Sequence, residues 1–165
     1  MEGNIDTQEV LNSFLARSYW LEIKMEQTKE WFAYLDVKSE DAKQVLFQIT
    51  KDSDNHKHVL KKLFLNINDF NLENMLSELS LDVENYSFRN KINEEIFQEI
   101  FECEKKAYDL FSLIKEKTDK NLIKKVWKGK DPDEFFNTFS WLISEEKRHI
   151  ELIQPYSLGS ITRIL

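Results

Sequence analysis

Apolar residues recur at intervals of three and four along four long stretches of the chain, and this spacing predicts four long helices. The stretches cover about residues 6–35, 39–65, 91–117 and 131–153. The chain has only three glycines and two prolines in 165 residues, which favours long helices over a β architecture with many turns. The sequence therefore predicts an all-α fold.

Residues that favour helix starts stand at the beginning of two of these stretches. Ser39 precedes the second stretch, where its hydroxyl can accept a hydrogen bond from the first helical turn. The last stretch opens with Asp131, Pro132, Asp133 and Glu134. An aspartate cap, a proline in the first helical position and a glutamate in the third are a strong start signal.

The connection between the second and third stretches, residues 66–90, is polar and rich in asparagine. One short helix is expected inside it, from the apolar residues Leu72, Met75, Leu76 and Leu79. A connection of this length lets the chain cross from one end of a helical bundle to the other. We expect a crossover here, so that the second and third helices run in the same direction.

Length and composition predict a single domain over residues 1–165. The net charge of -7, without a basic stripe, argues against a nucleic-acid partner. No run approaches about 18 apolar residues, and the polar start MEGNIDTQEV is unlike a signal peptide. We therefore expect a cytoplasmic protein without a membrane partner. The single cysteine, Cys103, excludes an internal disulfide and a four-cysteine metal site.

Two polar residues interrupt the apolar stripe of the last helix. Glu146 and His149 lie between Ile143 and Ile150, and their spacing of three places them on one helix face. This face is expected to be buried. Because burying a charged carboxylate without a partner is costly, a cation, a hydrogen-bond network or a metal ion is needed to compensate it.

The other three helices also carry polar groups on their apolar stripes. In the third helix, Glu104 occupies a seam position where an apolar residue is expected. In the first helix, Glu22 fits the apolar stripe better than Glu26 does. In the second helix, His56 lies on the stripe, whereas His58 is offset by two residues and is expected to be exposed.

These groups stand about 14 to 17 residues from the connected end of each helix, and therefore at similar heights along helices that pair antiparallel. A lone buried histidine is more often satisfied by a hydrogen bond within an ordinary helical bundle. Three acids and two histidines at one level favour a metal site instead. Imidazole and carboxylate ligands suit iron or manganese, with zinc as an alternative.

Short motifs in three of the helices resemble those of the ferritin-like di-iron carboxylate superfamily, especially its rubrerythrin-like and bacterioferritin-like members. EEKRHIELI is similar to the fourth-helix signature, with Glu146 and His149 as the matching residues. ECEKKAYDLF is similar to the third helix, with Glu104, and KDSDNHKHVLKKL to the second, with His56. The resemblance implies a ferritin-like four-helix bundle, in which two helices give one glutamate each and two give Glu-x-x-His.

Position 53 departs from this family pattern, because it carries a serine where the family has a bridging glutamate. Asp52, four residues before His56, could reach the same space with a shorter side chain. Loss of a bridging carboxylate predicts weaker binding of two irons, or a single metal ion. The metal ligands expected are Glu22, Asp52, His56, Glu104, Glu146 and His149.

The resemblance implies a protein that binds one or two iron ions and reacts with oxygen, peroxide or ferrous iron. A chain with one cysteine cannot form the rubredoxin-type module of a full rubrerythrin, so an external electron-donor protein is expected. The alternative is a non-catalytic bundle with a partly lost metal site that acts by binding, and this leaves open whether the protein is an enzyme. Aromatic residues expected on the surface, such as Trp20, Trp31 and Trp141, favour a homodimer.

Overall fold

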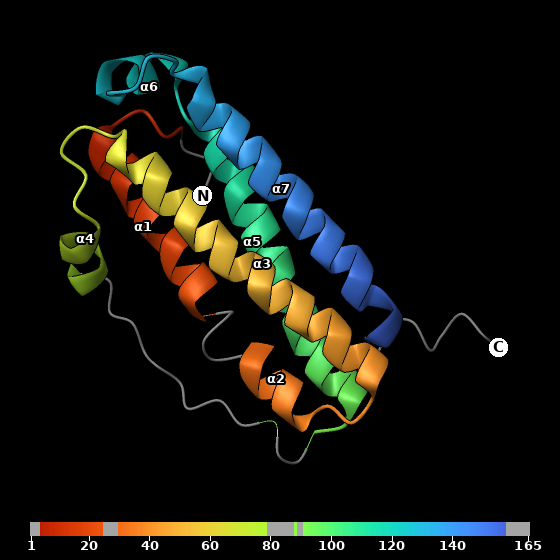
Figure 1. The fold of residues 1–165 in the computed structure, drawn as a ribbon. Coiled ribbons are helices and arrows are strands. Elements are labelled where there is room, and N and C mark those ends of the chain that lie inside the picture. Colours follow the sequence, from red (N-terminus) through yellow and green to blue (C-terminus); the bar gives the residue numbers. More distant parts are fainter. Residues whose placement is uncertain (1–3, 25–29, 79–87, 89–90, 158–165) are drawn as a thin grey trace.

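The computed structural model describes residues 4–24, 30–78, 88 and 91–157 (Figure 1). In chain order the helices are α1 (Gln8–Lys24), α2 (Trp31–Asp36), α3 (Glu40–Leu65), α4 (Leu72–Glu78), α5 (Asn93–Lys117), α6 (Lys120–Val126), α7 (Asp133–Ile153) and the short 3-10 helix η2 (Gln154–Tyr156). The described residues form no strand, only two isolated bridges, so the predicted all-α fold is confirmed for them. None of their helices is long and apolar enough to cross a membrane.

The four long helices, α1, α3, α5 and α7, lie side by side along the molecule (Figure 1). Both α1 and α7 pack against α3 and against α5. Helices α3 and α5 run in the same direction, whereas α1 and α7 run in the opposite one (Figure 1). The chain must therefore return along the length of the molecule between α3 and α5, which is what the predicted crossover requires. Helix α4 lies on this connection, and residues 79–87 and 89–90 of it are outside the described residues.

The predicted first helix, residues 6–35, is described in two pieces, α1 and α2. Residues 25–29 lie outside the described residues, and the alternative candidate Glu26 is among them. Helix α2 packs against α3, as α1 does. Glu30, immediately before α2, has helical backbone angles of φ -65° and ψ -44° and a fully buried side chain.

Capping side chains set the starts of two long helices, as the sequence predicts. The backbone N–H of Ala42 in α3 donates to Ser39 Oγ at 3.4 Å. At the start of α7, the backbone N–H of Asp133 donates to Asp131 Oδ1 at 2.9 Å. These bonds satisfy helix-end N–H groups that have no partner inside the helix.

The buried apolar residues form two clusters, one towards each end of the bundle. One contains Leu15, Leu60, Phe111 and Phe139 among its members. The other contains Leu46, Ile49, Phe97, Ile100 and Ile153 among its members. Between the two clusters, each long helix presents a buried polar side chain. Because apolar burial on both sides packs the helices closely, the polar layer between them is enclosed by protein.

Candidate metal centre

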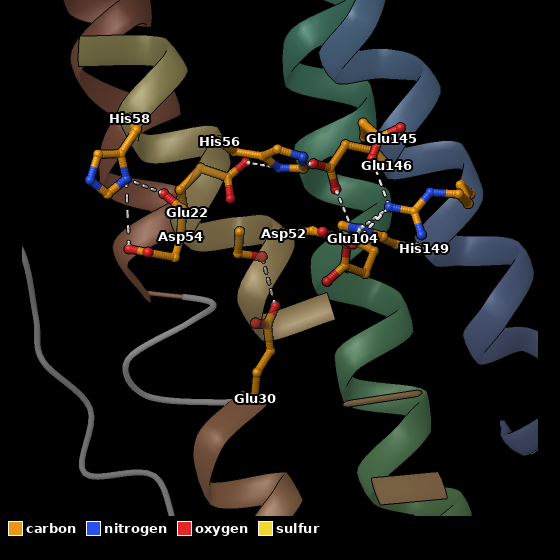
Figure 2. Close-up of polar contacts among 12 residues, drawn as sticks. Glu22, Glu30, Asp52, Asp54, His56, His58, Glu104, Glu145, Glu146 and His149 are labelled. Carbon is orange, nitrogen blue, oxygen red and sulfur yellow. Dashed lines mark hydrogen bonds and ion pairs between the residues drawn. The ribbon is translucent and has the colours of Figure 1, made fainter. Parts of the chain in front are cut away.

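A layer of charged side chains crosses the interior between the two apolar clusters. Glu22 comes from α1, His56 from α3, Glu104 from α5, and Glu146 and His149 from α7; all five are fully buried. Figure 2 shows their polar ends turned toward one another between the helices. The structure therefore brings together the five residues that the helical stripes predict to meet.

The two histidines of α3 differ in exposure in the way that the stripe predicts. His56 is fully buried, whereas the His58 side chain is 67% exposed. The Nδ1 of His58 donates to the backbone oxygen of Asp54 at 2.8 Å, outside the bundle core (Figure 2). The predicted register of this helix is confirmed.

His56 lies between two buried carboxylates. Its Nδ1 is 3.0 Å from Glu146 Oε1 and 3.4 Å from Glu22 Oε1. Neither approach has the direction of a hydrogen bond, so both ring nitrogens of His56 are without a hydrogen-bond partner. The edge of Trp141 packs on the ring, with the centroids 5.3 Å apart and the planes at 88°. Packing therefore positions the imidazole and leaves its Nδ1 available to a ligand.

His149 occupies the corresponding position on α7. Its Nδ1 is 3.0 Å from Glu104 Oε2 and 3.9 Å from Glu146 Oε2. Its Nε2 faces outward and lies 3.4 Å from Asp52 Oδ2. A carboxylate behind the outer nitrogen is the arrangement that fixes the tautomer of a metal-binding histidine.

Glu146 is common to two groups of metal-donor side chains. One group is Glu22, His56 and Glu146; the other is Glu104, Glu146 and His149. Within each group the ligand atoms lie within 4.8 Å of one another. Oxygen Oε1 of Glu146 faces His56, and Oε2 faces His149. One carboxylate thus stands between two histidine–glutamate pairs, as two metal ions with a shared carboxylate would require.

A third group of donors lies nearer the surface and is less suited to a metal ion. It consists of His56, Glu145 and His149. Glu145 is only partly buried, and its Oε2 accepts a hydrogen bond from Arg148 Nη2 at 2.7 Å. Because the arginine already balances this carboxylate, the two interior groups are the stronger candidates.

Several oxygen atoms of the interior layer have no hydrogen-bond partner. They are both carboxylate oxygens of Glu22, both of Glu146, and Oε1 of Glu104. Buried polar atoms in proteins are nearly always paired, because an unpaired one loses its hydration without compensation. Carboxylate oxygens on three helices that have at most an ion-pair contact with a histidine fit a metal cation better than a closed hydrogen-bond network.

Burial makes the interior acids harder to ionise in the metal-free protein. It raises the pKa of Glu104 to about 7, and the negative charge of Glu146 adds to the rise. Burial also raises the pKa of Glu22, although the contact with His56 opposes the shift. In their ionised form, these acids therefore depend on the two histidines for a compensating positive charge.

The interior histidines are held in their protonated form by these acids. Burial lowers the pKa of His56, but Glu146 and Glu22 outweigh it and raise the pKa to about 10. Burial likewise lowers the pKa of His149, while Glu104 and Asp52 raise it to about 11. In the metal-free protein, protons on the histidines supply the positive charge that the carboxylates need.

Asp52 lies at the edge of the layer, which differs from its predicted place among the interior ligands. Its side chain is 25% exposed, and Oδ2 accepts a hydrogen bond from Arg148 Nη2 at 2.7 Å. The contact with His149, opposed by burial and reinforced by Arg148, lowers the pKa of Asp52. One residue along a helix turns the side chain by about 100°, so Asp52 points away from the interior position of Ser53. Asp52 supports His149 from behind and is in neither interior group.

Glu30 is a further buried acid of this layer that the helical stripes do not single out. Ser53 Oγ donates to its Oε1 at 3.2 Å, and its Oε2 has no hydrogen-bond partner. Burial, and then the charges of Glu104 and Glu22, raise the pKa of Glu30 well above its usual range. Its spacing from Glu22, eight residues further along, is one at which a helix returns to the same face and is the signal that could have found it.

Comparisons with known proteins give no indication of function, so the proposal below rests on the geometry of the site and on the motifs of the sequence. No protein-family model, no curated protein and no solved structure matches this chain.

Proposed function

We propose that this protein binds divalent transition-metal ions in its interior, iron in the first place, with manganese or zinc as alternatives. The observation that carries the proposal is the position of Glu146 between His56 and His149, which creates two donor groups with one shared carboxylate. Imidazole and carboxylate donors suit these metals. Cys103, the only thiol of the chain, belongs to neither group.

Charge supports a cation in this layer. Metal ligands must be deprotonated, so an ion would replace the protons that His56 and His149 hold in the metal-free protein. The ion would then provide a positive charge next to Glu22, Glu104 and Glu146. Without it, their oxygens have no hydrogen-bond partner, or have only a histidine as their partner. The same exchange would relieve the cost of three buried acids close together.

Residues around the donors would orient and enclose them. Asp52 can accept a hydrogen bond from the N–H at Nε2 of His149, which would leave Nδ1 of that ring to bind a metal ion. Arg148 holds Asp52 in place through the hydrogen bond at 2.7 Å. Trp141 covers His56, and the two apolar clusters exclude water from the ends of the layer.

The similarity of the helical motifs to the ferritin-like superfamily extends the proposal to a ferritin-like bundle with oxidoreductase activity. Helices α3 and α5 running in the same direction support this architecture (Figure 1). Bound iron would supply redox chemistry with oxygen or peroxide. Alternatively, the centre would bind ferrous iron as its substrate and oxidise it. Reduction of the bound iron would need an external electron-donor protein.

The homodimer is part of the same proposal. Trp31 is 39% exposed and Trp141 36% exposed, and Trp20 is partly buried. Large aromatic side chains at the surface are typical of association sites. Light scattering coupled to size-exclusion chromatography would measure the mass in solution, and a monomer would contradict this part.

Metal content is the experiment that tests the proposed function. The protein is purified without chelators and measured by elemental analysis. A chelator-treated sample is then titrated with Mn(II), with Zn(II), and with Fe(II) under anaerobic conditions. We expect one or two ions bound per chain and a melting temperature that rises with metal concentration. A protein that binds neither Mn(II), Fe(II) nor Zn(II) would contradict the proposal.

A second candidate function rests on Ser53. Because α3 lacks the glutamate that the family pattern has at this position, a non-catalytic bundle acting as an interaction module is the alternative. This alternative predicts weak metal binding, which metal titration measures. It also predicts no metal-dependent oxidation of Fe(II) or consumption of peroxide, which activity assays measure.

A further inference from the structure

Glu30 fills the space beside Ser53 with a carboxylate from another part of the chain. Its side chain is fully buried, and Figure 2 shows it reaching from the start of α2 toward the polar layer. Oxygen Oε1 accepts the hydrogen bond from Ser53 Oγ at 3.2 Å. Ser53 itself is buried and carries a hydroxyl group in place of a carboxylate.

Among the described contacts, Glu30 makes no ion pair with a lysine or arginine side chain. Its second oxygen, Oε2, is buried and has no hydrogen-bond partner. The charges of Glu104 and Glu22 each repel it more strongly than the charge of His149 attracts it. One hydroxyl hydrogen bond does not compensate a buried carboxylate next to two others. A cation bound in this layer would offset the repulsion among the buried acids, and Oε2 of Glu30 could contribute to its coordination.

Charge counting gives Glu30 a specific role. The two donor groups contain three carboxylates, those of Glu22, Glu104 and Glu146. Two divalent ions carry four positive charges, one more than these three carboxylates neutralise. A fourth buried carboxylate makes the layer neutral with two ions bound and with both histidines unprotonated.

We propose that Glu30 is a ligand that allows the centre to hold two ions, a carboxylate moved from α3 to the start of α2. This inference rests on the proposed metal centre. Ser53 is its positioning residue, because the hydroxyl binds Oε1 and leaves Oε2 for the metal. A glutamate at position 53 would begin at the residue whose hydroxyl binds Glu30, so it could place a carboxylate near the same position.

The first test compares Glu30→Gln with the wild-type protein and with Glu102→Gln. Glu102 is an exposed acid of α5, two residues from Glu104, and it accepts a hydrogen bond from Gln98. Isothermal titration with Mn(II), and with Fe(II) under anaerobic conditions, gives the number of ions and the affinity of each. We expect two ions in the wild type and in Glu102→Gln. In Glu30→Gln we expect one ion to remain, and the second to bind at least about tenfold more weakly, since loss of even an indirect supporting group costs about that much.

A rescue variant separates a ligand from a merely structural residue. In the double variant Glu30→Ala with Ser53→Glu, the carboxylate returns to the same space from α3. We expect two-ion binding to recover, with a folded protein by circular dichroism. If the folded double variant still binds a single ion, the carboxylate at this place is not what the second ion needs, and the inference is wrong.

The outcomes distinguish this inference from the proposed function. Two ions with unchanged affinities in Glu30→Gln would overturn the role of Glu30 and leave the metal centre intact. No ion in the wild-type protein would overturn both. Loss of the second ion in Glu30→Gln, with Glu102→Gln unchanged, supports the role of Glu30 directly.

Discussion

The imidazole rings of His56 and His149 stack on each other across the interface of α3 and α7. Their centroids are 5.5 Å apart and their planes are inclined by 21°. Two protonated rings at this distance repel each other, and only the carboxylates around them make the protonated state favourable in the metal-free protein. A divalent ion bound to each ring would remove the need for either proton. Protons and metal ions therefore compete for the same layer.

This competition predicts opposite pH dependences for the metal-free and metal-loaded protein. The folded-state pKa values of Glu104, His56 and His149 are raised to about 7, 10 and 11. At pH values between its unfolded and its folded pKa, each group is more fully protonated in the folded state. Its contribution to stability is therefore lost as pH rises through its folded pKa. We expect the free energy of unfolding of the metal-free protein to fall as pH rises from about 5 to 9.

The metal-loaded protein should behave in the opposite way. Metal affinity rises with pH because the ligands must lose their protons, so stabilisation by a fixed excess of Mn(II) should grow over the same range. Chemical denaturation at pH 6 and pH 9, with and without Mn(II), measures both slopes. Parallel slopes would argue against competition between protons and metal in this layer.

Replacing the two histidines of α3 provides a matched pair of variants. His56→Gln removes a donor of one interior group, so we expect metal affinity to fall by at least about tenfold. His58→Gln changes an exposed ring on the same helix and should leave affinity unchanged. Titration with Mn(II) measures both. Equal affinities in the two variants would place the metal elsewhere.

Glu104→Leu should make the metal-free protein more stable while it loses metal. Leucine restores the apolar seam of α5 and removes an acid that burial makes hard to ionise. His149 keeps Asp52 and Glu146 as neighbours. We expect the free energy of unfolding at pH 8 to increase, because His149 can lose its proton once Glu104 is gone and no unpaired buried charge then remains. Denaturant titration checks it, with the exposed Glu102→Leu as the control that should change stability by less than about 0.5 kcal/mol.

Asp52→Asn tests the residue that stands behind His149. An amide keeps the shape of the side chain but loses the charge that faces Nε2 and pairs with Arg148. We expect metal affinity to fall by about 10–100-fold, as for other groups that orient a ligand. Asp54→Asn, on the exposed side of the same helix, is the control. If both variants bind metal like the wild type, Asp52 has no supporting role.

The local pattern of the chain was sufficient to predict the helices and the direction of most site residues. Helix periodicity depends only on spacing, so it separated buried His56 from exposed His58 and placed Glu104 in the interior seam. The caps at Ser39 and Asp131 act within one turn and were equally predictable.

The place of Asp52 was decided by the tertiary structure. Its side chain is long enough to approach the interior layer, but it accepts a hydrogen bond from Arg148 on α7 at the edge of that layer. The spacing of residues within α3 does not predict where an arginine of a neighbouring helix lies. The prediction of Asp52 as an interior ligand differed from the structure for this reason.

Glu30 shows the same division from the other side. By sequence it is one of many acids in a charged chain, and its burial depends on how α2 packs against α3. The small side chain of Ser53 leaves room for it and supplies its hydrogen bond. Sequence spacing determined which helix faces carry acids and histidines, because that is a local property. Which carboxylate fills the space beside Ser53 was decided only by the packing of segments distant along the chain.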